Sequence, residues 1–306
     1  MNKADEYMYR CIENILLDGY KDVNPRPKYK DGEPAHTYSV NHVMRKYDLS
    51  KDEFPILTLR PIAWKTGIKE ILWIYQDATN DLKHLKEKYN VHYWDEWESK
   101  DYPSTIGKGR YGDVVREYDL MHELLDGLKN NPYGRRHIID LYQYKGLNES
   151  DGLYPCAFLT IWNVRNNLST DKEYLDMCLI QRSGDMLTAS GAGGINEIQY
   201  IALMMMVARH CGYELGVFTH FICNEQIYDR HIEQAKEMMN RYENAFLDEL
   251  DGIDNIEEYH HRISKRLKPK LILNPEKTNF YDMTIDDFTM LDYEPIKPQL
   301  KLELGI

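Results

Sequence analysis

The stretch NEIQYIALMMMVARH (196–210) is apolar on nearly every side. A helix that is hydrophobic all round is stable only when other elements cover it. Apolar or alternating runs with the length of strands lie before it at 137–144, 157–164 and 175–181, and after it at 215–223. These patterns predict a buried central helix packed against a sheet.

Regular patterns continue outside this centre, and strand-like sequence also occupies 37–47. Apolar residues recur at helical spacing in four segments: 5–17, 62–76, 114–128 and 228–242. The composition changes abruptly at 243–268, which is acidic at first and then basic, so we expect a surface insertion there. The sequence has no internal repeats and no Ser/Pro-rich linker. It therefore predicts a single α+β domain over 1–306.

The composition is typical of a soluble globular protein, with 42% apolar and 29% charged residues among 306. No run of 18 apolar residues occurs, which argues against a transmembrane helix. The charged start MNKADEYMYR lacks the apolar core of a signal peptide. Five cysteines without a CxxC pair indicate reduced thiols in a cytoplasmic protein, and no metal-site spacing occurs, so we expect no metal. A net charge of -12 argues against general binding of nucleic acids.

One cysteine stands where a reactive thiol could form. Cys156 follows Pro155, which cannot donate a hydrogen bond to a sheet, so the cysteine should open a strand beside a turn. Arginines close to such a thiol would favour its nucleophilic thiolate form. An inert buried cysteine is an equally good interpretation of these residues alone.

Two arginine motifs suggest a site for a small anion. Arg135 and Arg136 follow an Asn-Asn-Pro turn, and Arg182 with Ser183 ends another expected strand. Guanidinium groups that converge from two strands can bind one phosphate, although a lone Arg-Arg pair is more often a solvated surface feature.

The glycine-rich stretch SGAGG (190–194) runs into the central helix, where a loop could also bind phosphate. It lacks the spacing of known nucleotide-binding loops, so we expect a flexible loop that covers a ligand. The run YWDEW (93–97) offers ring surfaces and carboxylates that suit a flat heterocycle, and core tryptophans beside solvated acids are the common alternative.

Taken together, these segments closely resemble the folate-dependent thymidylate synthases over nearly the whole chain. The resemblance rests on motifs in matching order: DGEPAHT (31–37), KEILWIYQ (69–76), WDEW (94–97), NNPYGRRHI (130–138), LYPC (153–156), QRSGD (181–185), NPEKTNFYD (274–282) and IDDF (285–288). It implies a large mixed sheet flanked by helices and a homodimer whose sheets pack back to back. It also implies reductive methylation of deoxyuridylate (dUMP) to thymidylate (dTMP), with 5,10-methylenetetrahydrofolate as co-substrate.

The resemblance assigns nucleotide-binding roles to several positions. Cys156 matches the nucleophile that adds to C6 of the pyrimidine, and Asn196 matches the amide that pairs with the uracil edge. Tyr228 and Gln226 match positions at the sugar hydroxyl. The phosphate would be bound by residues of both subunits: Arg26, Arg182 and Ser183 of one, and Arg135 and Arg136 of the other. Gln181 is a further residue expected to bind dUMP.

The resemblance assigns catalytic and folate-binding roles to a second group. Glu70 and Tyr111 match residues that organise water and transfer protons, and Trp94 matches a residue at the folate ring. Asp185 matches the carboxylate that orients the pterin. Ile306 matches the C-terminal residue whose carboxylate closes over the site.

The chemistry accounts for these residue types. Uracil C5 becomes nucleophilic only after a thiolate adds at C6 and converts the C5–C4 unit into an enolate. A general base, here water held by Glu70 and Tyr111, then removes the C5 proton. An asparagine at 196 offers both an acceptor to N3–H and a donor to O4, whereas an aspartate would suit cytosine.

The chain departs from the family pattern at three places. Gln226 stands where the family usually has a histidine, the segment between Asp185 and Asn196 is about three residues longer, and one extra residue precedes Tyr111. These changes concern the selection of the sugar and the geometry of folate, and they remove no catalytic group.

Two alternative functions use the same motifs. In a pyrimidine hydroxymethylase, water captures the methylene intermediate, but Trp94 and Leu153 match bulky residues that exclude water. A non-catalytic paralogue acting as a binding protein would fit the altered Gln226 and glycine loop. The retained Cys156, Arg182, Asn196 and Tyr228 argue against it.

Overall fold

The structure is a computed structural model that describes residues 1–253, 255, 257–258 and 268–306. Its central helix is α7 (Ile195–Cys211), and every residue from Glu197 to Ala208 is buried. Gly212 ends this helix with a φ of 85°, a conformation that costs glycine little, and donates its N–H to the Ala208 carbonyl. The predicted buried helix is therefore confirmed.

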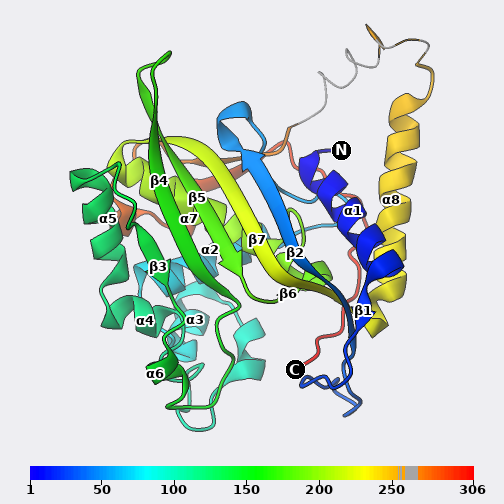
Figure 1. The fold of residues 1–306 in the computed structure, drawn as a ribbon, viewed down its shortest axis with the longest axis horizontal. Coiled ribbons are helices and arrows are strands. Elements are labelled where there is room, and N and C mark those ends of the chain that lie inside the picture. The colour runs from blue at the N-terminus through cyan, green and yellow to red at the C-terminus, as the bar shows by residue number, and fades with distance from the viewer. Residues whose placement is uncertain (254, 256, 259–267) are drawn as a thin grey trace.

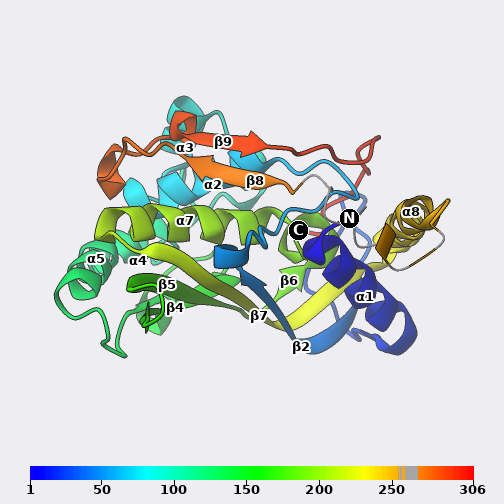
Figure 2. The ribbon, with the colours of Figure 1, turned by 90° about the horizontal axis from the view of Figure 1, so that it is seen from above.

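A mixed sheet forms the floor on which α7 lies (Figure 2). Its strands follow the order β1-β2-β7-β5-β4-β3, and β6 pairs with β7. Strands β5 and β6 run parallel to β7, and the other neighbours are antiparallel. The strand bounds are β1 (Tyr20–Lys21), β2 (Thr37–Asp48), β3 (Ile138–Asp140), β4 (Ala157–Asn167), β5 (Lys172–Gln181), β6 (Gly184–Asp185) and β7 (Glu214–Tyr228). The predicted α+β class with a large mixed sheet is confirmed.

Among the described residues, helices cover one face of this sheet and none covers the other, which we call the bare face (Figures 1 and 2). Helices α7 and α2 lie on the covered face. The two-stranded sheet of β8 and β9 lies on the far side of these helices. Helices α1 and α8 pack together at the β1–β2 edge. The remaining bounds are α1 (Lys3–Asp18), α2 (Trp64–Ile71), α3 (Leu82–Tyr89), α4 (Gly112–Glu117), α5 (Leu120–Asn130), α6 (Tyr144–Leu147), α8 (Ile232–Leu250), β8 (Lys270–Leu273) and β9 (Phe288–Leu291).

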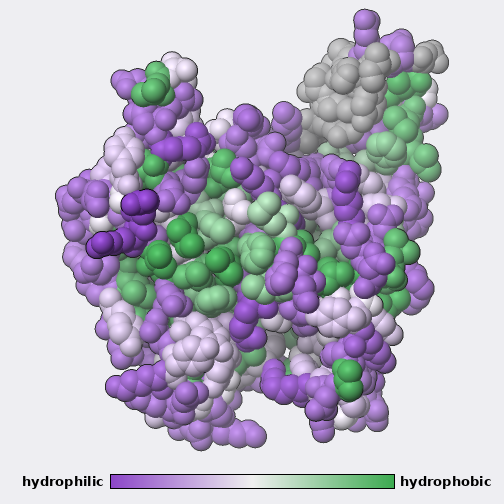
Figure 3. All heavy atoms as spheres, in the orientation of Figure 1, coloured by the Kyte–Doolittle hydropathy of each residue, from purple (hydrophilic) through white to green (hydrophobic). Residues whose placement is uncertain are grey.

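The bare face of the sheet is largely apolar. Figure 3 shows hydrophobic residues gathered over the strands in the view of Figure 1. The strands alternate, so that Phe218 and His220 of β7 are buried while Val217, Thr219 and Phe221 remain partly exposed. Met44 of β2 is 60% exposed on the sheet. An apolar sheet face of this kind is typical of a contact with another protein surface.

Two predicted helices are interrupted in the structure. The helix expected over 114–128 is two helices, α4 and α5, because Tyr118 leaves the helical conformation and Asp119 has a φ of 50°. The helix expected over 62–76 becomes a π-helical turn from Leu72 to Gln76. Such turns widen a helix locally and are common beside functional sites.

Two further predictions differ in their boundaries. The strand expected over 137–144 is only β3, since α6 begins at Tyr144. Helix α8 continues to Leu250, so the first part of the segment expected as an insertion at 243–268 is helical. Most of the rest, 254, 256 and 259–267, lies outside the described residues.

The glycine-rich stretch 190–194 is not the flexible covering loop that its composition suggested. All five of its residues are buried. A Cβ on Gly193, whose φ is +65°, would lie 2.2 Å from the backbone nitrogen of Leu57. The glycines thus permit a tight approach between this loop and the chain near Leu57.

Shortening a buried side chain of α7 should weaken the whole domain. Leu203 of α7 is fully buried. We expect Leu203→Ala to lower the free energy of unfolding by about 2–5 kcal/mol, because transfer energy is lost and a cavity remains. Urea denaturation followed by circular dichroism measures this change.

The matched control is Leu168→Ala at the tip of the β4–β5 hairpin, where the side chain is 92% exposed. Its effect should stay within about 0.5 kcal/mol. Equal effects of the two substitutions would contradict the placement of α7 in the core.

Candidate active site

A cavity of about 950 Å³ opens where β4 begins and where β5 and β7 end. It contains every site residue expected from the sequence except Arg135, Arg136 and Ile306. The predicted residues that line it are Arg26, Glu70, Trp94, Tyr111, Cys156, Gln181, Arg182, Ser183, Asp185, Asn196, Gln226 and Tyr228. These residues come from segments far apart in the chain and form one site.

Cys156 lies directly before β4, as Pro155 predicted, and its thiol is half-buried in the cavity wall. Arg182 Nη2 donates to Sγ over 3.5 Å, and the same guanidinium donates to the Tyr154 and Pro155 carbonyls. Burial raises the pKa of the Cys156 thiol, while the charges of Arg182 and Arg26 lower it. The positive charge of Arg182 can therefore stabilise a thiolate that forms at this sulfur.

Tyr111 is coupled to the cysteine through its hydroxyl oxygen. This oxygen accepts the backbone N–H of Cys156 at 3.1 Å. The Tyr111 backbone has a φ of +43°, a strained conformation for a residue other than glycine. Burial is the main cause that raises the pKa of Tyr111 far above its ordinary value. The hydroxyl therefore keeps its proton and can donate a hydrogen bond into the cavity.

Glu70 is the buried acid of the site. It belongs to α2, which approaches α7 closely because Gly67 has no side chain: a Cβ there would lie 3.1 Å from Ile195 Cγ2 and 3.2 Å from Gln199 Cγ. Burial raises the pKa of Glu70 to about 8, although the nearby Gln199 and Trp94 side chains oppose this rise. A carboxyl group with this pKa can both accept and donate a proton near neutral pH.

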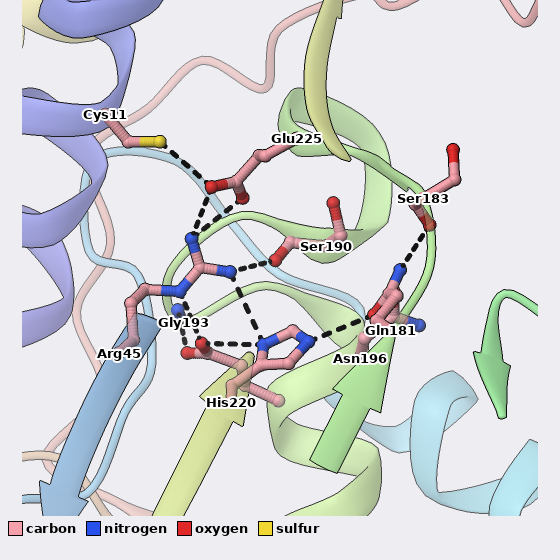
Figure 4. Close-up of polar contacts among 10 residues, drawn as sticks. Cys11, Arg45, Gln181, Ser183, Ser190, Gly193, Asn196, His220 and Glu225 are labelled. Atoms are coloured by element: carbon pink, nitrogen blue, oxygen red, sulfur yellow. Dashed lines mark hydrogen bonds and ion pairs between the residues drawn. The ribbon is translucent and has the colours of Figure 1, made fainter. Parts of the chain in front are cut away.

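Two amides form a hydrogen-bonded pair at the end of β5 and the start of α7 (Figure 4). Gln181 Nε2 donates to the Ser183 carbonyl at 3.0 Å and to Asn196 Oδ1 at 3.3 Å. Asn196 Nδ2 donates to Gln199 Oε1 at 2.9 Å. These contacts give the Asn196 amide a defined orientation at the cavity wall.

Asp185 lies at the end of β6, where its Oδ1 accepts the Thr188 N–H at 3.3 Å. Burial raises the pKa of Asp185, while the nearby His231 charge opposes the rise. Strand β6 pairs with β7 so that Asp185 lies opposite Gln226. The carboxyl group and the glutamine therefore share one wall of the cavity with Tyr228.

Three expected site residues lie outside the cavity lining. Arg135 and Arg136 are exposed on the segment that leads into β3. The backbone of Ile306 pairs with that of Lys28 through hydrogen bonds of 2.7 and 2.9 Å. The residues before it, Leu304 and Gly305, do line the cavity, so the C-terminal segment closes part of its mouth.

The sequence reasoning missed some lining residues. Gln199 binds Asn196 and lowers the pKa of Glu70, and its position three residues after Asn196 on a helix could have revealed it. Tyr142 lies in the wall close to Tyr154, with ring centroids 5.9 Å apart. No local sequence signal marks Tyr142, because its place depends on how β3 pairs with β4.

The part of the chain that the structure describes has neither a metal-site cluster nor a membrane-spanning helix. No cluster of three or more His, Cys, Asp or Glu side chains arranged for a metal ion occurs there. Within the same residues, no helix has the length and apolar character needed to cross a membrane.

Comparisons with known proteins agree with this geometry. The family model described as thymidylate synthase matches residues 6–306. Over 308 aligned residues covering both chains entirely, the chain is 47% identical to a thymidylate synthase of Streptococcus pneumoniae strain 70585 and 46% identical to one of Streptococcus gordonii. Its structure matches the thermostable thymidylate synthase A from Bacillus subtilis with a TM-score of 0.79 and 34% identity, covering 99% of each chain.

The resemblance inferred from ordered motifs is thus confirmed over the whole length of the chain and in three dimensions. With its cysteine, arginine and amide groups gathered in one cavity, the chain belongs to the thymidylate synthase family.

Proposed function

We propose that this protein catalyses the reductive methylation of dUMP to dTMP with 5,10-methylenetetrahydrofolate. The observation that carries the proposal is the Cys156 sulfur, which lies 3.5 Å from the Arg182 guanidinium in a cavity that also holds Asn196. This combination supplies a nucleophile, a cation that favours its thiolate, and an amide suited to a pyrimidine edge. The similar proteins described above are named thymidylate synthases, and that name denotes this reaction.

The nucleotide would be oriented by several groups that line the cavity. Arg26, Arg182 and Ser183 offer cationic and hydroxyl donors to the phosphate. Asn196 would accept from uracil N3–H and donate to O4. Tyr228 and Gln226 lie where they can bind the sugar hydroxyl, and glutamine can both donate and accept there.

The first chemical step forms a bond between Sγ of Cys156 and C6 of uracil. The sulfur electron pair makes this bond, and the C5=C6 electrons move toward O4 as an enolate. Donation from Asn196 Nδ2 stabilises the charge that develops on O4. Reversal of the addition at the end of the reaction returns the electron pair to sulfur, and the product is released.

Proton transfer at C5 is the second task of the chain. Glu70, whose pKa is near 8, and the Tyr111 hydroxyl both line the cavity and can bind a water between them. Through that water the C5 proton can pass to Glu70. The Tyr111 hydroxyl also accepts the backbone N–H of Cys156, and this hydrogen bond fixes the hydroxyl relative to the nucleophile.

Several residues that line the cavity could bind a folate. The rings of Trp94 and Trp97 pack with centroids 5.7 Å apart and form an aromatic wall, and Asp185 offers a buried carboxyl group to ring N–H donors. Methylenetetrahydrofolate supplies the one-carbon unit and the hydride. Trp94, Asp185 and the carboxylate of Ile306 would bind it and keep water away from the reacting carbon.

We further propose that two copies pack through the bare sheet faces. The apolar side chains on this face would be covered by the same face of the partner, as a two-fold contact requires. Arg135 and Arg136 are exposed and do not line the cavity of their own chain, which fits binding to the phosphate in the partner's cavity. We also infer one domain over 1–306, with a surface insertion near 243–268, in a cytoplasmic protein. The five free cysteines suit a reducing compartment.

The proposed reaction is tested by identifying its product. We expect the protein with dUMP and methylenetetrahydrofolate to yield dTMP, detected by mass spectrometry. Cys156→Ala should lower the rate by a factor on the order of 10⁴ or more, because the nucleophile is lost. Cys211→Ala, at the far end of α7, is the matched control and should remain active.

Two outcomes would contradict the proposal. Hydroxymethyl-dUMP as the main product would indicate a hydroxymethylase. A folded protein that forms no covalent adduct with 5-fluoro-dUMP and folate at Cys156 would instead indicate a non-catalytic paralogue.

The raised pKa of Glu70 should appear in the pH dependence of stability. Between its unfolded pKa of about 4.3 and its folded pKa of about 8, the folded protein retains a proton that the unfolded chain has released. The free energy of unfolding should therefore fall as the pH rises through this window. Replacing Glu70 by Gln removes the effect.

Urea denaturation at pH 5.5 and 7.5 measures this dependence. Relative to Glu70→Gln, the native protein should lose about 1–3 kcal/mol between the two pH values. Glu87→Gln, at an exposed position on α3, serves as the matched control and should keep the native dependence. An unchanged pH dependence in Glu70→Gln would exclude a buried neutral Glu70.

The arginines proposed to act across the dimer can be tested by mixing subunits. The double variant Arg135→Ala/Arg136→Ala and the variant Cys156→Ala should each be nearly inactive. Refolded together in equal amounts, they should recover about a quarter of the native activity, because half the dimers are hybrids with one complete site.

The control mixture combines Arg182→Ala with Cys156→Ala. Arg182 contacts Cys156 of its own chain, so no hybrid has a complete site and no activity should return. Failure of the Arg135/Arg136 mixture to recover activity would show that these arginines do not serve the partner's site.

A further inference from the structure

A chain of buried polar side chains runs from α1 to the amides of the cavity wall (Figure 4). The proposed reaction uses only its last members. In order of contact, the chain consists of Cys11, Glu225, Arg45, Glu197, His220, Gln181 and Asn196. Arg45, Glu197, His220 and Glu225 are each at most 1% exposed, so their polar groups must be satisfied by one another.

Arg45 is the centre of this chain. Its Nε donates to Glu197 Oε1 at 2.7 Å, and its Nη1 donates to Glu225 Oε1 at 2.7 Å. Burial acts to raise the pKa of Glu197, but the Arg45 charge together with the contacts from His220 and the Gly193 N–H outweighs it, and the pKa falls to about 2. Arg45 Nη2 also donates to the Ser190 carbonyl at 2.5 Å, and Glu197 Oε2 accepts the Gly193 N–H at 2.7 Å. The ion pairs therefore fix the glycine-rich loop as well.

His220 connects these ion pairs to Gln181. Its Nδ1 lies 3.1 Å from Glu197 Oε1 and 3.4 Å from Arg45 Nη2, so this nitrogen has a partner with or without a proton. Its Nε2 lies 3.1 Å from Gln181 Oε1. The opposite side of the Gln181 amide donates to the Ser183 carbonyl, which can only accept. Gln181 Oε1 must therefore accept, and Nε2 of His220 must carry a proton.

The orientation of Gln181 in turn determines that of Asn196. Because Gln181 Nε2 faces Asn196 Oδ1, the Asn196 Nδ2 group points to Gln199 Oε1. With the base bound against this amide, as proposed above, the Asn196 oxygen would accept from uracil N3–H and its nitrogen would donate to O4. Rotation of the amide by 180° would match cytosine, which has an acceptor at N3 and a donor at C4.

We propose that His220 is a positioning residue which, through Gln181, holds the Asn196 amide in the orientation that selects uracil over cytosine. Arg45 and Glu197 hold the imidazole in place. This inference rests on the proposed function, and it assigns a role in specificity to residues that do not touch the nucleotide.

Two substitutions at the same position test the role of the Nε2 proton. The amide nitrogen of a glutamine reaches about as far as His Nε2, whereas that of an asparagine reaches only as far as Nδ1. We expect His220→Gln to keep the native ratio of dissociation constants for dCMP and dUMP. His220→Asn should lower that ratio about tenfold, because Gln181 and Asn196 are free to rotate. Isothermal titration with each nucleotide measures the ratio.

Cys11→Ala is the matched control, since the thiol donates to Glu225 at the other end of the buried chain. It should leave the ratio of dissociation constants unchanged even if it lowers the melting temperature. An unchanged ratio in folded His220→Asn would overturn the proposal. An equal change in Cys11→Ala would do so as well, because it would show a general loss of packing.

The native protein provides a measurement that needs no variant. Nitrogen-15 labelling of histidine shows by NMR which ring nitrogen carries a proton, and we expect a proton on Nε2 of His220. An unprotonated Nε2 would overturn the proposal. If the native protein forms dTMP while either test fails, only this inference falls. If the native protein binds neither nucleotide, the proposed function falls with it.

Discussion

A guanidinium group without access to water is the constraint on which much of this molecule depends. Arg45 lies on β2 opposite His220 of β7, and its charge is balanced by Glu197 of α7 and Glu225 of β7. Loss of one partner from such a buried group typically costs about 3–5 kcal/mol, because a charge remains unpaired. The strands, the first turn of the central helix and the glycine-rich loop can therefore adopt the native arrangement only together.

This constraint also links the stability of the fold to the chemistry of its cavity. Glu197 directly follows Asn196, so the ion pair that anchors the start of α7 also fixes the backbone of the residue proposed to bind the base. In a similar way, the hydroxyl of Tyr111 binds the backbone of Cys156. The residues proposed to act on substrate are thus held by contacts that do not involve substrate, as expected of a preorganised site.

The sequence predicted the features that depend on local pattern. The apolar run at 196–210 identified α7, and Pro155 placed Cys156 before a strand, because periodicity and proline geometry act over a few residues. It did not reveal the Arg45 cluster, whose partners are 152 and 180 residues away in the chain. Nor did it predict that the glycine-rich stretch is buried, because the carboxylate and guanidinium that bind it lie on other elements. Ordered motifs correctly indicated the family, but they could not show how Gln181 and Asn196 orient each other.

The close approach of α2 and α7 at Gly67 has a consequence for the acid of the site. The proton affinity of Glu70 arises mainly from burial, and its burial depends on how tightly these two helices pack. A methyl group at position 67 would lie 3.1 Å from Ile195 Cγ2 and 3.2 Å from Gln199 Cγ, so we expect it to push the helices apart and make the carboxyl group less buried. The pKa of Glu70 therefore depends on how closely two helices pack. A substitution at position 67, which is not proposed to contact substrate, can change that pKa.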